Sequence, residues 1–258
     1  MKKFYLLSVI LFLLNSCVSS PWLVNETNVY VDEKVADLIY SDRTLTIFPF
    51  SDKIVTVNNL DDITKVYDVD SSYAATLIRD SLYNYICHQS TSAITNVILN
   101  EVAIPIEISE ANTSMSNYST ITENLDIDES YTFLIPKEEY LRSLNVKPDI
   151  ILVINKIETG DSSMFMSYGN NIVNFTSGAI TAGIGTGSST PYLGVSLEFI
   201  LWDYMNNDPI KYGNIFVKTD QSYYDENEIW NATYQNVTKE IVSRTPFELK
   251  SGVRVNRN

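Results

Sequence analysis

The chain has 258 residues, a formal net charge of −14 at pH 7 and a pI near 4.4, and 45% of its residues are hydrophobic. A chain this acidic is repelled by phosphate backbones, so nucleic acid is a poor partner. The length and the apolar fraction suffice for a substantial hydrophobic core.

The start of the chain has the order of a secretory signal. Two lysines follow Met1, and the mostly apolar residues 4–14 are too few to span a bilayer, which needs about 20 apolar residues. The next residues, Leu14-Asn15-Ser16-Cys17, resemble a bacterial lipobox, in which the cysteine is lipidated and becomes the first residue of the mature chain. An ordinary signal peptide cleaved nearby is the alternative.

The lipobox resemblance implies a signal peptide at residues 1–16, lipidation at Cys17 and a location in the bacterial cell envelope. We expect the mature protein to be anchored to a membrane through this lipid, on the periplasmic face of the outer membrane. Cys87 is the only other cysteine, so the mature chain then has no internal disulfide. A single cysteine in a helical pattern is typically a small buried hydrophobe.

The first elements alternate between strand and helix patterns. Residues 17–40 are expected to form a lipidated tether with an edge strand at 29–31. Residues 43–50 are rich in β-branched and aromatic side chains and predict a buried strand. Residues 53–60 follow as a loop or a short strand, and the polar cluster Asn58, Asn59, Asp61 and Asp62 predicts a turn.

The clearest helical pattern covers residues 70–90, with one broad apolar face and Ser71 or Ser72 as the expected N-cap. Residues 92–108 predict one or two strands interrupted at Pro105. Residues 109–130 are polar and acidic and are expected to form an exposed loop.

The second half of the chain is expected to begin with a short helix that has Pro136 in its first turn and ends near Asn145. A near-continuous apolar run at 149–158 predicts a central strand. Two strand-like segments around a small-residue turn at 178–189, a strand at 211–220 and a helix at 226–244 follow. That helix should bury Ile229, Val237 and Ile241, with Trp230 and Tyr234 alongside.

These elements predict one α/β domain at residues 41–248, built as a single mixed β-sheet with two to three packed helices. A flexible basic tail is expected at 249–258.

Four segments carry a resemblance to a known group of envelope domains. The strand "TLTIFPFSD", the helix "AATLIRDSLYNYI", the helix–turn–strand "YLRSLNVKPDIILVINKIE" and the hairpin "GVSLEFILWDYMNNDPIKYGNIFV" are similar to elements of the TolB N-terminal domain and of the curli-secretion lipoprotein CsgG. The resemblance covers residues 43–245 apart from 109–130. It implies a protein that, like these and the LpoB-like activators of cell-wall synthases, binds other proteins. It supplies no catalytic residue, and only Cys17 is carried over.

The sequence offers little for catalysis or metal binding. Cys87 and His88 are adjacent on a helix, where they point about 100° apart and cannot act as a pair. With one histidine, a structural zinc site is not expected. The acidic residues 126–130 lack the pattern of a calcium-binding EF-hand loop and are expected to be solvated. We expect no cofactor and no metal.

Two segments remain as candidates for interaction. The glycine-rich residues 178–189 lead into a strand and lack a P-loop lysine, so they predict a flexible hairpin tip or the tip of a membrane-inserting hairpin over 171–200. Tyr223 and Tyr224 lie in an acidic loop and are candidates for a partner-facing patch.

The leading hypothesis is therefore a lipid-anchored, non-enzymatic binding or assembly factor whose partner is an envelope protein. The first alternative is a subunit of an oligomeric channel or secretion ring that uses the 171–200 hairpin. A hydrolase with an unrecognised acidic site is the third.

Overall fold

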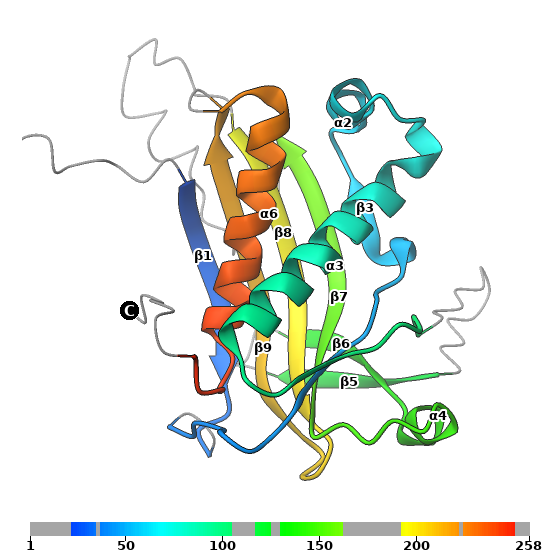
Figure 1. The fold of residues 1–258 in the computed structure, drawn as a ribbon, viewed down its shortest axis with the longest axis vertical. Helices are drawn as coiled ribbons and strands as arrows, with labels where there is room; N and C mark the ends of the chain where they lie inside the picture. Colours follow the sequence, from blue (N-terminus) through cyan, green and yellow to red (C-terminus); the bar gives the residue numbers. More distant parts are fainter. Residues whose placement is uncertain are drawn as a thin grey trace, which may run out of the picture.

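The computed structural model describes residues 22–34, 37–104, 117–124, 130–161, 192–221 and 224–250, which form a single α/β domain (Figure 1). The strands are β1 (Trp22–Val31), β2 (Leu45–Ile47), β3 (Val55–Val57), β4 (Val97–Leu99), β5 (Tyr118–Asn124), β6 (Ser130–Pro136), β7 (Ile150–Asp161), β8 (Tyr192–Asp203) and β9 (Asp208–Asp220). The helices are α2 (Leu60–Tyr67), α3 (Ala74–Ala93), α4 (Glu138–Ser143) and α6 (Glu226–Ser243), with 3-10 turns η1 (Asp52–Ile54) and η2 (Ser71–Tyr73). The expected fold class is confirmed.

The main sheet is mixed and has β7 and β8 at its centre. Its strand order is β1-β9-β8-β7-β2-β4, and β3 also pairs with β7. The pairs β7–β8, β8–β9 and β1–β9 are antiparallel, whereas β2 and β3 pair with β7, and β4 with β2, in parallel. The antiparallel half of the sheet is built from long strands, of which β8 and β9 are joined by a tight turn, and the parallel pairings involve the short strands β2, β3 and β4.

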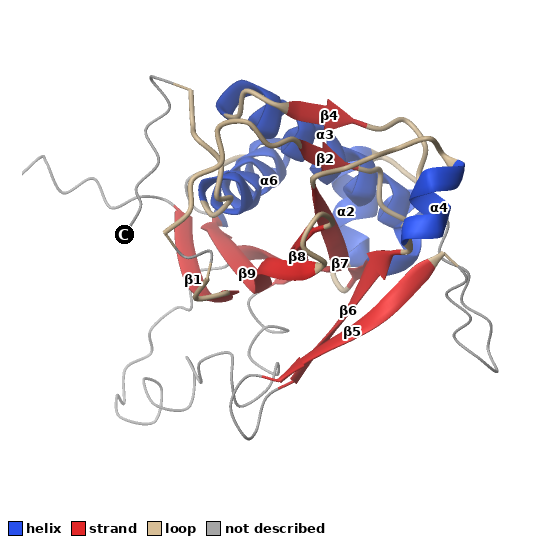
Figure 2. Ribbon diagram, turned by 90° about the horizontal axis from the view of Figure 1, so that it is seen from below, coloured by secondary structure: helices blue, strands red, loops and turns tan. Residues whose placement is uncertain are grey.

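The sheet is covered differently on its two faces (Figure 2). Helices α3 and α6 lie on one face, and the β5–β6 hairpin lies on the other. Side chains alternate accordingly along β8: Leu197 and Phe199 belong to the core that includes α3 and α6, whereas Ile200 and Trp202 pack in the cluster that includes Phe133 of β6. Both faces of the central strands are thus buried, which accounts for their near-continuous apolar sequence.

One row of paired residues marks the upper end of the sheet in Figure 1. Trp22 of β1 pairs with Thr219 of β9, Thr219 with Leu193 of β8, and Leu193 with Asp161 of β7. We call these four residues the end row. Neighbouring strands lie about 4.8 Å apart, so the row spans about 14 Å. The β8–β9 turn lies at the opposite end of the sheet.

Several predicted elements are confirmed. The central strand expected at 149–158 is β7, and the strand expected at 211–220 is within β9. The helix expected at 226–244 is α6, and its predicted inward side chains are buried: Ile229, Trp230, Tyr234, Val237 and Ile241. Strands β2, β3 and β4 lie within the segments expected at 43–50, 53–60 and 92–108, but each has only three residues.

Two predictions near the first helices are wrong. The polar cluster expected to form a turn instead begins α2, with Asp61 and Asp62 in its first turn, where carboxylates favour the positive helix end. Neither Ser71 nor Ser72 caps the 70–90 helix. Asp70 instead caps η2, and η2 leads directly into α3. The backbone of Asp70 is extended, so the Asp70 carboxylate accepts a hydrogen bond from the Ser72 amide at 2.8 Å.

Two further predictions are wrong around the second hairpin. Residues 118–124, expected within an exposed acidic loop, form β5, which pairs with β6 and buries Tyr118 against the sheet. Pro136 ends β6 instead of starting a helix. The short helix is α4, and its end near Asn145 is confirmed by the left-handed backbone of that residue, with φ of 58°.

The edge strand expected at 29–31 is confirmed and extends back to Trp22, so β1 occupies part of the expected tether. Only residues 18–21 therefore lie between Cys17 and the start of β1. Cys17, Tyr223, the glycine-rich residues 178–189 and residues 251–258 lie outside the described residues, as do the first strand-like segment before the glycines and residues 126–129.

Candidate functional site at the β8–β9 turn

A buried carboxylate holds the four-residue turn between β8 and β9. Asp203, only 2% exposed, ends β8 and accepts hydrogen bonds from the backbone amides of Met205 at 2.9 Å and Asn206 at 3.0 Å. Its second oxygen accepts from the Asn206 side chain at 2.7 Å. The left-handed backbone of Asn207, with φ of 56°, closes the turn.

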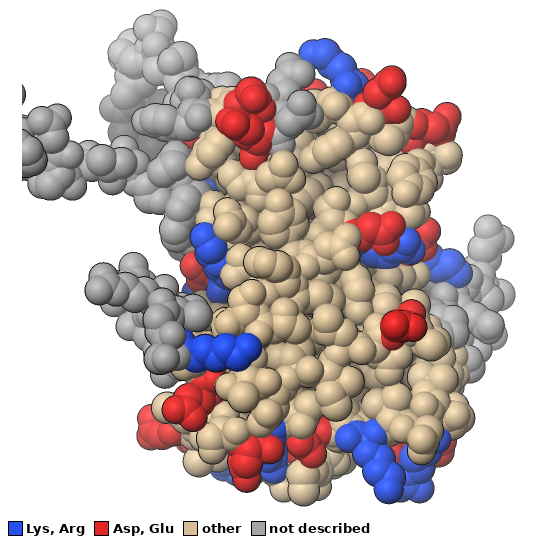
Figure 3. All heavy atoms as spheres, viewed as in Figure 1, with Lys and Arg blue, Asp and Glu red and all other residues tan. Residues whose placement is uncertain are grey.

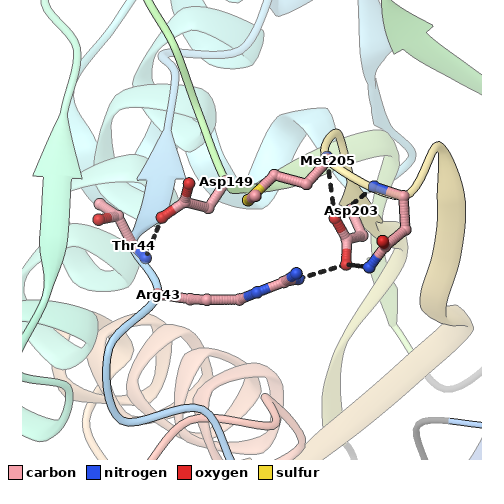
Figure 4. A network of polar contacts seen from close by, with 6 residues as sticks. Arg43, Thr44, Asp149, Asp203 and Met205 are labelled. Atoms are coloured by element: carbon pink, nitrogen blue, oxygen red, sulfur yellow. Dashed lines mark hydrogen bonds and ion pairs between the residues drawn. The ribbon is translucent and has the colours of Figure 1, made fainter.

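Arg43 completes the set of partners around this carboxylate (Figure 4). Its guanidinium forms an ion pair with Asp203 across the lower end of the sheet and lies 4.8 Å above the centre of the Tyr40 ring. Partial burial lowers the pKa of Arg43, but the hydrogen bond to Asp203 and the charge of Asp203 raise it above its ordinary value. Arg43 therefore stays charged, and the segment before β2 is fixed to the β8–β9 turn.

The next residues lock the same corner. The Asp149 carboxylate accepts from the Thr44 amide at 2.9 Å, and the Asp149 carbonyl accepts from the Tyr204 amide at 2.9 Å. The Tyr204 hydroxyl donates to the carbonyl of Pro136 at the end of β6. Burial raises the pKa of Tyr204 well above its ordinary value, so this hydroxyl remains a donor at all physiological pH values. The turn is thus tied to three separate segments of the chain.

This rigid turn exposes an apolar side chain beside a groove. Met205 is 68% exposed, the largest fraction among the exposed large hydrophobic residues of the described chain. The groove has a volume of about 330 Å³ and runs between the turn and α4, and its apolar lining comes from Leu141, Val146, Pro148, Tyr204 and Met205. We call this feature the turn groove.

Charged groups form the rim of the turn groove. Glu138, Arg142 and Lys147 line it, and Arg142 is ion-paired with Glu138 one helical turn away on α4. An apolar floor with a charged rim is the usual arrangement of a protein-binding surface, where methionine is enriched and adapts to its partner. The described lining contains no nucleophile paired with a base.

A second, smaller cleft lies between α2 and the start of α6. It has a volume of about 170 Å³, below the range usual for drug-sized ligands, and includes the predicted residue Tyr224 together with Asp62, Asp225 and Trp230. The Asp225 carboxylate is already engaged, because it accepts from the Glu228 amide at 2.8 Å at the start of α6. Tyr224 is half-buried and packs against the main core.

The predicted Cys87 and His88 lie on different sides of α3. Cys87 is buried, and His88 is exposed. Burial raises the pKa of the Cys87 thiol, while a hydrogen bond with Tyr83 opposes this effect. Thiolate is therefore scarce at neutral pH.

We expect iodoacetamide to alkylate Cys87 several times more slowly in the folded mature protein than in the same protein unfolded by urea. The folded thiol is both buried and protonated, whereas the unfolded thiol has an ordinary pKa. Mass spectrometry of the Cys87 peptide over time measures both rates. Equal rates would contradict a protected thiol at this position.

Two findings concern metal binding and membrane-spanning helices within the described residues. No group of three or more His, Cys, Asp or Glu side chains is close enough there to hold a metal ion. None of the helices in the described ranges is both long and apolar enough to cross a membrane.

Sequence reasoning missed the turn groove. The resemblance predicts the hairpin itself, but the partner of Asp203 is Arg43, 160 residues earlier in the chain. A Met-Asn-Asn turn after an Asp is the only local signal, and it indicates a turn without indicating a groove.

The chain was compared with known proteins. No family model matches it, and no curated protein matches it. Among solved structures it is similar to the PelC dodecamer from Paraburkholderia phytofirmans, at 9% identity and a TM-score of 0.32, covering 86% of this chain and 99% of that chain. A substituted form of that PelC dodecamer gives 7% identity and the same TM-score of 0.32, covering 87% of this chain and 99% of that chain. Likeness at this level supports no inference for the present chain.

The fold and the groove together define the class: a single-domain α/β protein with a mixed sheet, an interlocked hairpin turn and an apolar surface groove beside it.

Proposed function

We propose that this protein is a lipid-anchored component of the bacterial cell envelope that binds a partner protein without catalysing a reaction. Cys17 carries the lipid, and the periplasmic face of the outer membrane is the expected location. The observation that carries the binding role is the turn groove: a fixed turn exposes Met205 beside an apolar groove of about 330 Å³.

The exposure of Met205 on a fixed turn supports this proposal. Contiguous exposed apolar surfaces rimmed by polar residues mark interaction sites, and Met205 together with the apolar lining of the turn groove forms such a surface. The turn that exposes Met205 is held by a buried carboxylate with four partners, so little conformational entropy is lost when a partner binds. A rigid apolar projection next to a groove is the arrangement expected of a binding hot spot.

Charge reversal at the exposed methionine tests the binding role. With a photo-crosslinking residue at Lys147 in the full chain in its native membrane, we expect a defined crosslinked product. Met205→Glu should weaken the interaction by about 2 kcal/mol, or roughly 30-fold, because it places a charge in the apolar contact. Quantitative mass spectrometry of the crosslinked product measures the loss.

Tyr73→Glu is the matched control, since it places the same charge on another large exposed apolar side chain, at the start of α3. It should leave the crosslinked product unchanged. If Met205→Glu and Tyr73→Glu give the same yield as the unsubstituted protein, the turn groove is not the binding surface.

A subunit of an oligomeric channel or secretion ring, using residues 171–200 as a membrane hairpin, is the second candidate. One observation favours it: β7 ends and β8 begins at the end row, where the chain from Cys17 also enters the sheet. An anchor and a membrane hairpin would then emerge from one end of the domain. Electron microscopy of the lipidated full chain in detergent tests this candidate. Closed rings are the expected result, and their absence would contradict it.

A further inference from the structure

We propose that the end-row end of the domain faces the lipid surface of the membrane, and that the turn groove is held on the far side of the domain. This inference rests on the proposed lipid at Cys17. It identifies the bilayer as the partner of one end of the sheet and leaves the other end for a protein.

The length of chain between the lipid and the sheet sets the first limit. Five residue steps separate Cys17 from Trp22, where β1 begins. A chain spans at most about 3.5 Å per residue, so Trp22 lies within about 18 Å of Cys17 in any conformation of the intervening residues. The rest of the end row follows, because Thr219, Leu193 and Asp161 are paired with Trp22 in sequence across the sheet.

The length of the strands sets the second limit. From Leu193 in the end row to Asp203 at the turn, β8 advances by ten residues, or about 33 Å at about 3.3 Å per residue. The turn groove therefore lies much farther from the start of β1 than any part of the end row does. Figure 1 shows the start of β1 and the β8–β9 turn at opposite ends of the long axis.

Electrostatics favours an upright domain over one lying flat. The full chain carries a net charge of −14, so bringing the whole length of the domain close to anionic headgroups is unfavourable. Acidic side chains also occur at the upper end, over the start of α6 and around α2 (Figure 3). At physiological salt the Debye length is about 8 Å, so charges farther than this from the headgroups are largely screened. The linker between Cys17 and Trp22 can span up to about 18 Å, which is longer than the Debye length. The linker thus lets this end face the bilayer without close charge contact.

The two ends of the sheet suit different partners. The end row lies within reach of the proposed lipid on Cys17, because β1 begins five residue steps after that cysteine. A protein that reaches the turn groove must, in contrast, extend about 33 Å beyond the membrane-facing end, so the groove fits a domain in the aqueous phase and not a lipid headgroup.

Energy transfer to labelled lipids tests the orientation. The lipidated full chain is reconstituted into phosphatidylethanolamine–phosphatidylglycerol vesicles that carry acceptor-labelled headgroups. Donor dyes are placed singly at Gln221 beside the end row, at Gln235 midway along α6 and at Met205 in the turn. We expect transfer to fall in the order Gln221, Gln235, Met205, with several-fold higher efficiency at Gln221 than at Met205.

Equal transfer from the three sites means a domain lying flat, and the reverse order means an inverted domain; either result overturns the orientation. The mass of the reconstituted protein distinguishes this failure from failure of the anchor. A chain without lipid on Cys17 overturns both the proposed anchor and the orientation, whereas a lipidated chain with equal or reversed transfer overturns the orientation alone.

Discussion

Replacement of Cys17 by serine is expected to move the protein from the membrane fraction to the soluble fraction. Serine cannot form the thioether that carries the lipid, and each buried CH₂ of an acyl chain contributes about 0.8 kcal/mol to membrane binding. With more than one chain, release of the lipidated protein is very slow. Without any acyl chain, the protein has no electrostatic attraction to an anionic surface, because its full sequence carries a net charge of −14.

Fractionation followed by immunoblotting measures this change, and intact-protein mass spectrometry detects the lipid. Cys87→Ser is the matched control, because it makes the same chemical change at the other cysteine and should leave the lipid and the membrane association intact. If Cys17→Ser is processed normally and stays with the membrane, the anchor proposal is wrong, and an ordinary cleaved signal peptide becomes the better interpretation.

Replacement of Asp203 by alanine is expected to have the largest effect on stability among the polar residues of the turn. The substitution leaves the Arg43 guanidinium without its ion-pair partner and leaves the amides of Met205 and Asn206 without an acceptor. Breaking a buried pair by removing one partner costs about 3–5 kcal/mol. Urea unfolding followed by circular dichroism measures the loss of free energy of unfolding.

Asp208→Ala is the matched control, because Asp208 faces Asp203 across the same turn but is exposed. Substitution of a surface carboxylate of this kind changes the free energy of unfolding by no more than about 0.5 kcal/mol, so the unfolding midpoint of the Asp208→Ala protein should barely move. If the two substitutions lower the free energy of unfolding equally, the hydrogen bonds and ion pair of Asp203 do not hold the turn. In the absence of urea, the Asp203→Ala protein should also lose the crosslinked product formed from position 147, since Met205 is no longer held in place.

The strands and helices that pack directly on the sheet could be predicted from local pattern. The apolar run at 149–158 indicated β7, and the spacing of Ile229, Val237 and Ile241 indicated α6, because burial on a sheet imposes a period that the residues themselves show. The lipobox at Cys17 is likewise a local signal. It led to an anchor hypothesis that needed no knowledge of the fold.

Elements that depend on distant partners were misread. Residues 118–124 are polar in sequence and gain their place as β5 only by pairing with β6 and burying Tyr118. The cluster around Asp61 and Asp62 has turn-like composition, yet it opens α2, whose Ile63 is fully buried. In both cases burial against the rest of the domain overrides a weak local preference.

The sequence by itself thus determined the class of fold, the central strands, the two long helices and the candidate lipid at Cys17. Only the tertiary structure decided where the proposed functions lie. Arg43 meets Asp203 across 160 residues of chain, and Trp22 reaches Asp161 through two intervening strands. Register and long-range pairing arise from the packing of the whole core, so no local pattern encodes which ends of the strands come together.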